Sequence, residues 1–121
     1  MIQNEMDFSS WLDSQLNVEI PAEVVAFNIN VYEAPFTIEI VGSNDFDADD
    51  EDWACNGDWI PSARSIEVSN HLFGNSWEVA EQNIVDMARS YLKSNYVNAS
   101  KLKRAKAFAV GFVDGSLNLI N

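Results

Sequence analysis

Apolar side chains recur with the spacing of a helix in two segments of the chain. Residues 7–16 carry apolar side chains three and four positions apart, which predicts a short amphipathic helix with Asp7 as its N-cap. The same spacing over residues 77–95 predicts a longer helix, and Ser76 before it is a favourable N-cap. Two tryptophans fall on these apolar faces and are expected in the core: Trp11 and Trp77.

Five further segments are alternating or short apolar runs, which is the pattern of strands. The expected strands are residues 25–32, 37–41, 65–69, 105–113 and 117–120. Only a short turn with Pro35 separates the first two, so we expect them to form an antiparallel hairpin. The fourth is apolar on both faces, which favours a position inside the sheet. One of its faces carries small residues that would let a helix pack closely: Ala107, Ala109 and Gly111.

The expected order of elements is α-β-β-loop-β-α-β-β. This order predicts an α+β fold class: a single two-layer domain over residues 1–121, with an antiparallel or mixed sheet of about five strands and two helices. A chain of 121 residues suits one domain, and 47% hydrophobic residues can build its core, which argues against intrinsic disorder. No apolar run approaches the roughly 20 residues of a membrane-spanning helix, so we expect no membrane contact.

Charge changes the picture because it is concentrated in one part of the chain. There are 19 acidic and 7 basic residues, which gives a formal net charge of −12. Residues 1–63 contain 14 acids and no lysine or arginine, and six of the eight residues in 45–52 are acidic. Because an acidic surface repels phosphates, we expect no nucleic-acid ligand and favour a cationic partner, either a basic protein or a metal ion. A solvated acidic loop without a partner is the simpler interpretation.

Residue spacing gives a metal site little support. Asp45, Asp47 and Asp49 have the spacing that begins a helix–loop–helix calcium site. However, Asp50 stands where that site needs glycine, and Asn56 stands where it needs a bidentate glutamate. We therefore predict no bound metal and no cofactor.

The residues of common catalytic sites are also scarce. The chain has one histidine, His71, and one cysteine, Cys55, which are too few for a zinc site. It has no glycine-rich phosphate loop and no Gly-x-Ser-x-Gly motif, so we predict that it is not an enzyme. A lone cysteine forms no internal disulfide, and residues 1–7 lack signal-peptide features, so we expect a cytoplasmic protein. Four bases could contact phosphate or balance the acids at a solvated edge: Lys101, Lys103, Arg104 and Lys106.

Aromatic side chains interleave with the acids in the long connection over residues 42–64. Protein-binding surfaces often combine an aromatic anchor, which supplies buried area, with a charged field, which speeds association. Trp53 and Trp59 either serve as such anchors or pin the loop to the core. The candidate partner-binding residues are Asp47, Asp49, Asp50, Glu51, Asp52 and Trp53.

Two segments carry a resemblance to a known class of proteins. They are VGSNDFDADDEDWAC at residues 41–55 and GFVDG at residues 111–115, within a small acidic α+β chain. In these features the chain is similar to the immunity proteins of bacterial polymorphic-toxin systems. The resemblance implies a stoichiometric inhibitor of a partner toxin, commonly a basic nuclease. It is compatible with the charge, because an acidic surface can imitate nucleic-acid phosphates.

The sequence therefore predicts a cytoplasmic acidic protein-binding module that engages a basic partner through residues 45–52. Two other functions stay open. One is a metal-binding or carboxylate-based enzyme that uses the loop over residues 45–58. The other is a structural homo-oligomer, in which the strand over residues 117–120 would pair two copies as a sheet edge.

Overall fold

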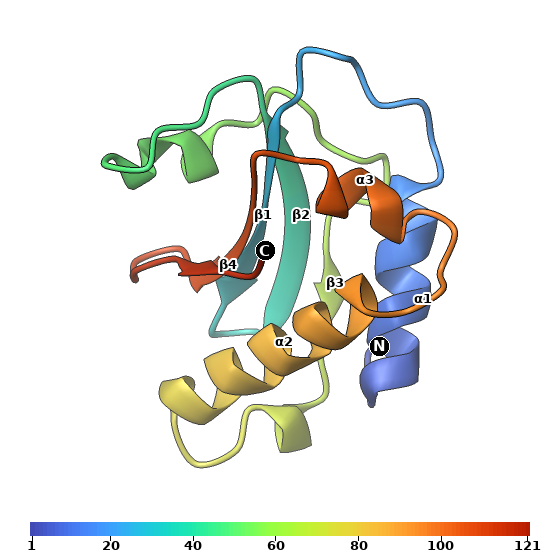
Figure 1. The fold of residues 1–121 in the computed structure, drawn as a ribbon. Coiled ribbons are helices and arrows are strands. Elements are labelled where there is room, and N and C mark those ends of the chain that lie inside the picture. The colour runs from blue at the N-terminus through green and yellow to red at the C-terminus, as the bar shows by residue number, and fades with distance from the viewer.

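The computed structural model describes residues 1–121 and has helices packed on one face of a five-stranded mixed sheet (Figure 1). The helices are α1 (Glu5–Leu16), α2 (Trp77–Leu92) and α3 (Ala99–Lys103), with 3-10 turns η1 (Glu51–Cys55) and η2 (Asn70–Leu72). The strands are β1 (Ala26–Tyr32), β2 (Thr37–Ser43), β3 (Ile66–Glu67), β4 (Ala107–Phe112) and β5 (Asn118–Leu119). The predicted α+β fold class is confirmed, with α3 as an additional helix. None of the helices has the length and apolar character that a membrane crossing needs.

The strand order is β3-β2-β1-β4-β5, so β1 lies at the centre of the sheet. It pairs antiparallel with β2, as the predicted hairpin requires, and parallel with β4. The hairpin register places Asn30 opposite Glu39, and the parallel register places Asn28 beside Ala109 and Asn30 beside Gly111. β5 forms one edge of the sheet, as the sequence predicts for the last strand.

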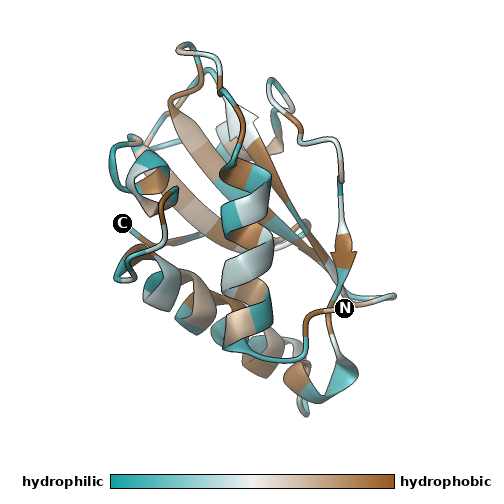
Figure 2. Cartoon of the chain, turned by 90° about the vertical axis from the view of Figure 1, so that its right-hand side faces the viewer, coloured by the Kyte–Doolittle hydropathy of each residue, from teal (hydrophilic) through white to brown (hydrophobic).

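Alternate residues of the three inner strands form the main core on the helix side of the sheet. These core residues are Phe27, Ile29, Val31, Ile38, Ile40, Phe108 and Val110. They pack against the apolar faces of α1 and α2, including Phe8, Leu12, Ile84 and Tyr91. Figure 2 shows α1 in front of strands that are largely hydrophobic. The helix layer therefore covers one face completely, and any polar site on the sheet has to lie on the opposite face.

The helix starts follow local capping chemistry. The Asn4 side chain accepts a hydrogen bond from the Asp7 backbone N–H at 2.9 Å, so α1 begins at Glu5 and Asn4 is the N-cap. The predicted N-cap Asp7 instead accepts from the backbone N–H of Gln3 at 3.0 Å. Ser76 is the N-cap of α2, as predicted, and accepts from the backbone N–H of Val79.

Two expectations about packing are wrong. Trp77 is 51% exposed, because it occupies the first position of α2, where its ring packs edge-on against Phe112 at the rim of the sheet. Trp11 is buried as expected. The small face of β4 meets no α-helix. Ala107 and Ala109 instead pack beneath Trp53 and Ala54 of η1, on the sheet face opposite the helices.

Candidate functional site

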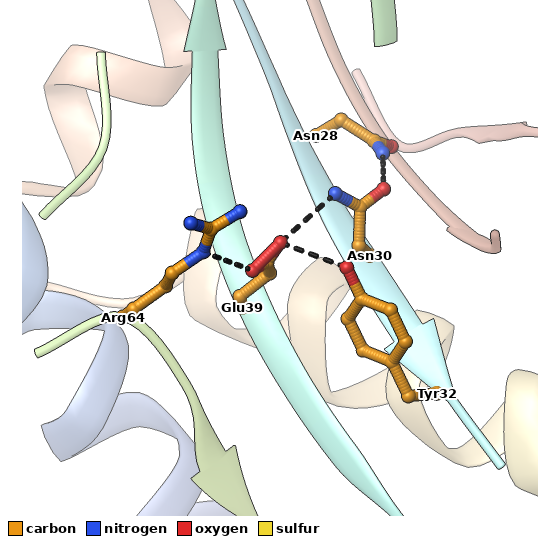
Figure 3. A network of polar contacts seen from close by, with 5 residues as sticks. All are labelled: Asn28, Asn30, Tyr32, Glu39 and Arg64. Atoms are coloured by element: carbon orange, nitrogen blue, oxygen red, sulfur yellow. Dashed lines mark hydrogen bonds and ion pairs between the residues drawn. The ribbon is translucent and has the colours of Figure 1, made fainter. Parts of the chain in front are cut away.

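The sheet face opposite the helices carries a cluster of polar side chains that is largely buried. Asn28 is 2% exposed and Glu39 is 3% exposed, and they join Asn30, Tyr32 and Arg64 in one hydrogen-bonded network (Figure 3). The alternation of apolar and polar residues along β1 and β2 predicts half-buried strands whose second face is exposed to solvent. That face is covered instead, because η1 and the chain after β4 fold over it.

Glu39 is the centre of the network. Its Oε1 accepts hydrogen bonds from the Tyr32 hydroxyl at 2.9 Å and from Asn30 Nδ2 at 3.5 Å. Its Oε2 accepts from Arg64 Nε at 3.2 Å, which is the one ion pair in the molecule. Asn30 Oδ1 in turn accepts from Asn28 Nδ2 at 2.7 Å. The donors therefore run in one direction, toward the carboxylate.

The carboxylate fixes the orientation of both amides. An ionised carboxylate only accepts hydrogen bonds, so Asn30 presents its Nδ2 to Glu39 and its Oδ1 to Asn28. Asn28 must then present its Nδ2 to Asn30, which leaves Asn28 Oδ1 at the end of the network. This oxygen is buried and is the one such side-chain atom in the chain with no hydrogen-bond partner. Buried polar atoms are rarely left without a partner, which makes this end of the network unusual.

Tyr32 and Arg64 hold the Glu39 carboxylate in place by donating hydrogen bonds to it. Burial and the hydrogen bond to Glu39 raise the pKa of Tyr32 above its ordinary value, so the phenol stays a donor at neutral pH. The Arg64 side chain is 64% exposed, whereas the Glu39 side chain is buried. Arg64 therefore reaches the carboxylate from outside and leaves most of its guanidinium in solvent.

These side chains line a cleft of about 470 Å³ between η1 and the segment that follows β4. A glycine at 111 permits this geometry, because a Cβ there would lie 2.9 Å from the backbone oxygen of Ser116. The charged residues that line the cleft are four acids, Glu39, Glu51, Asp52 and Asp114, and one base, Arg64. A cleft of this size can hold a small molecule or the side chains of a partner.

Several carboxylates of the predicted site hold the acidic loop in place. Asp47 Oδ1 accepts from the backbone N–H of Asp49 at 2.9 Å, and Asp50 Oδ1 accepts from that of Asp52 at 3.0 Å, which caps η1. Glu51 Oε2 accepts from the backbone N–H of Leu117 at 3.3 Å, which links η1 to the segment before β5. All five of these acids are nevertheless exposed.

Trp53 does not belong on the exposed part of the predicted site. It is 5% exposed and packs edge-on against Phe46, with a distance of 5.4 Å between ring centroids. It also belongs to the small apolar cluster on β1 and β4. Its ring therefore pins η1 to the sheet and leaves little surface for a partner. Trp59 is half-buried and packs edge-on against Phe27, so it anchors the other end of the loop.

Four of the five remaining predicted residues line two neighbouring hollows, whereas the exposed Asp49 lines neither. Glu51 and Asp52 line the polar cleft. Asp50 and Asp52, with Asp45 and Asp47, line a neighbouring hollow of about 380 Å³ on the loop itself. Asp52 lines both, so the cleft and the loop form one continuous acidic surface.

Few groups suited to catalysis or to metal binding come together. No three His, Cys, Asp or Glu side chains are placed to share a metal ion. His71 lies in η2, where its Nδ1 is 2.6 Å from the Ser69 hydroxyl, and it does not line the cleft. Cys55 lines the cleft as an exposed free thiol.

Sequence reasoning missed the network because its members look like solvated strand positions. One signal was available: a hairpin turn centred between residues 34 and 35 sets Asn30 opposite Glu39, and Asn28, Asn30 and Tyr32 share one face. No local pattern indicates Arg64, which reaches Glu39 from 25 residues away.

Comparisons of the chain with protein-family models, with curated proteins and with solved structures found no match.

Proposed function

We propose that this protein is a binding module for a basic protein, which it contacts through the cleft and the adjoining acidic loop over residues 45–52. The observation that carries this proposal is the buried Asn28 oxygen without a partner, at the floor of a cleft lined by four carboxylates and one arginine. Such a surface attracts a partner that brings positive charge and hydrogen-bond donors. The resemblance to immunity proteins adds the role: a stoichiometric inhibitor that covers a basic surface of a toxin.

The charge balance of the whole chain supports a basic partner. The chain has nineteen acids and seven bases, but only one ion pair forms among them, between Arg64 and Glu39. The acids of the loop therefore have no internal counter-charge, and their mutual repulsion is retained in the folded protein. A field of this kind speeds the approach of a basic protein and selects against acidic ones.

The proposal includes no catalytic step and places the protein in the cytoplasm. The one histidine lies outside the cleft, so the cleft has no imidazole to act as general base at neutral pH. The single free cysteine suits a reducing compartment, where inhibitors of this kind would meet their toxins.

The test is the association rate with the purified product of the reading frame directly upstream of this gene. We expect binding that slows steeply with salt. Neutralising the loop with Asp47→Asn, Asp49→Asn and Asp52→Asn should lower the association rate about tenfold at low salt, because the steering charge is lost. Each asparagine keeps an oxygen, so the loop hydrogen bond made by Asp47 can be retained.

The matched control removes three charges from α2, which lies on the other side of the sheet: Glu78→Gln, Glu81→Gln and Asp86→Asn. Its association rate should change less than about twofold, since these charges lie away from the contact. Equal effects of the two triple variants would mean that the total net charge of the protein, and not the position of the loop acids, controls the association rate. Absence of any complex with the wild type would remove the proposed function for this partner.

A further inference from the structure

We propose that the cleft receives an arginine side chain of the partner, whose guanidinium donates to Asn28 Oδ1 between the cleft carboxylates. This inference rests on the proposed function, because it takes the partner to be a basic protein. It assigns a chemical class of ligand to the cleft and a recognition role to Asn28, Glu51 and Asp52.

The first step is the identity of the missing group. Asn28 Oδ1 is a pure acceptor, and the amide orientations imposed by Glu39 leave it no donor within the network. The Tyr32 hydroxyl has one hydrogen, which Glu39 already receives. The ligand must therefore bring an N–H or O–H donor to the floor of the cleft.

The second step is the charge of the ligand. Four carboxylates and one guanidinium line the cleft, so a cation is attracted and an anion is repelled. A neutral donor would satisfy Asn28 but would gain no charge–charge attraction from Glu51, Asp52 and Asp114. Charge-assisted hydrogen bonds are also the stronger kind, which favours a cationic donor for a buried acceptor.

The third step separates guanidinium from ammonium. The acceptors that line the cleft come from separate elements: Asn28 lies on β1, Glu51 and Asp52 lie on η1, and Asp114 lies beyond β4. A guanidinium presents five N–H donors in a plane and can reach several separated acceptors, whereas an ammonium is a compact point charge. Arg64 already demonstrates the chemistry, because its guanidinium pairs with the buried Glu39.

The fourth step is space for a second guanidinium. Arg64 and Asn28 lie at opposite ends of the network (Figure 3). Arg64 occupies the Glu39 end of the cleft of about 470 Å³, because its Nε donates to Glu39 Oε2. The incoming group at the Asn28 end therefore need not displace Arg64.

The experiment uses three small probes that differ in the end group: acetyl-arginine amide, acetyl-lysine amide and the neutral isostere acetyl-citrulline amide. Cys55 lines the cleft and is the one cysteine in the chain, so its rate of alkylation reports occupancy directly. We expect the arginine probe to slow alkylation and to shift the Asn28 side-chain amide in an NMR titration. The citrulline probe should do neither, and the lysine probe should bind at least about tenfold more weakly.

Asn28→Leu removes the free acceptor and should weaken the arginine probe at least about tenfold. Because Asn28 is buried, its variant is paired with Glu51→Gln plus Asp52→Asn at two exposed positions, which should also weaken the probe. The glutamine keeps an oxygen that can accept the hydrogen bond from the backbone N–H of Leu117, so the fold should be retained. Asp86→Asn on α2 removes a charge far from the cleft and should bind as the wild type does. Equal binding of citrulline and arginine, equal binding of lysine and arginine, or unchanged binding to both cleft variants overturns the proposal.

The same variants separate this inference from the proposed function. If the basic protein binds Asn28→Leu as fast and as tightly as wild type, with its salt dependence intact, the arginine site is wrong and the function stands. If the arginine probe protects Cys55 in the wild type and no basic protein associates, the cleft chemistry is correct and the proposed partner is wrong.

Discussion

Two tyrosines in this protein donate to carboxylates, one on each side of the sheet. Tyr32 donates to Glu39 in the cleft, and Tyr91 donates to Asp13 at 2.7 Å on the helix side. Asp13 Oδ1 also accepts from the backbone N–H of Asn98 at 3.0 Å, so it joins α1 to α2 and to the start of α3. Burial, and then the hydrogen bond to Asp13, raise the pKa of Tyr91 far above its ordinary value.

These shifts predict a loss of stability in alkali. An unfolded tyrosine has a pKa of about 10, and the folded value is higher, so the folded state holds the proton more tightly. The stabilisation is complete below about pH 10 and is lost as the pH rises above 10 toward the folded value. Tyr91→Phe should lower the free energy of unfolding by about 1–3 kcal/mol at pH 7 and reduce its decline above pH 10.

Urea unfolding at a series of pH values measures both effects, with Tyr96→Phe as the matched control. Tyr96 packs against Tyr91 at a centroid distance of 5.5 Å but is more exposed, and its hydroxyl makes no hydrogen bond within the chain. Tyr96→Phe should therefore keep the alkaline decline of the wild type. An equally steep decline in Tyr91→Phe would mean that other groups cause it.

At the scale of elements, a base from the predicted basic cluster closes the end of a helix. Lys101 on α3 donates through Nζ to the backbone oxygens of Leu16 at 2.6 Å and Val18 at 2.8 Å. The last carbonyls of a helix lack partners within it, and α1 has no basic residue in its own last turn. The short helix α3 therefore supplies the cation that α1 needs.

Replacing this lysine should destabilise the protein, whereas replacing its neighbour should not. Lys101→Met keeps the aliphatic stem and removes the donor, so the free energy of unfolding should fall by about 1–3 kcal/mol. Lys103 on the same helix is exposed and makes no hydrogen bond, so Lys103→Met should change stability by less than about 0.5 kcal/mol. Chemical denaturation of both variants measures these changes in the free energy of unfolding. Equal stability of the two would assign Lys101 to the solvated edge.

Elements that depend on nearby residues could be predicted from the sequence, and elements that depend on distant ones could not. The helix after Ser76 and the hairpin around Pro35 follow from caps, periodicity and turn residues. The helix α3 spans five residues, too few for a periodic pattern, and its contacts come from Leu16 and Val18 far earlier in the chain. Helical spacing alone also misplaced Trp77, since the first turn of a helix can project beyond the core it covers.

The candidate site divides in the same way. The acids of residues 45–52 are evident in the sequence because they are clustered in one short segment. The burial of Glu39 is not, because it depends on η1 folding back over the sheet and on Arg64 closing the carboxylate. Trp53 shows this limit most clearly. Its acidic sequence neighbours are as compatible with an exposed anchor as with a buried one, and only the small face of β4 explains why it is buried.

At the scale of the whole molecule, the retained repulsion predicts that salt stabilises the folded protein. A net charge of −12 with one ion pair leaves most acids opposed by other acids. Raising the ionic strength from about 0.01 M to about 0.15 M shortens the Debye length from about 30 Å to about 8 Å, which screens repulsion between distant carboxylates. A gain of about 1 kcal/mol would raise the melting temperature by roughly 4 °C in a domain of this size.

The loop variant Asp47→Asn, Asp49→Asn and Asp52→Asn links this prediction to the proposed function. Removing three of the six acids in this segment should raise the melting temperature at low salt and shrink the further gain from salt, because less repulsion is left to screen. The same variant should associate more slowly with a basic partner. Thermal melts of wild type and variant in sodium chloride measure the first effect. A melting temperature independent of salt would mean that the acids are too well solvated to repel, and it would remove the electrostatic argument for their clustering.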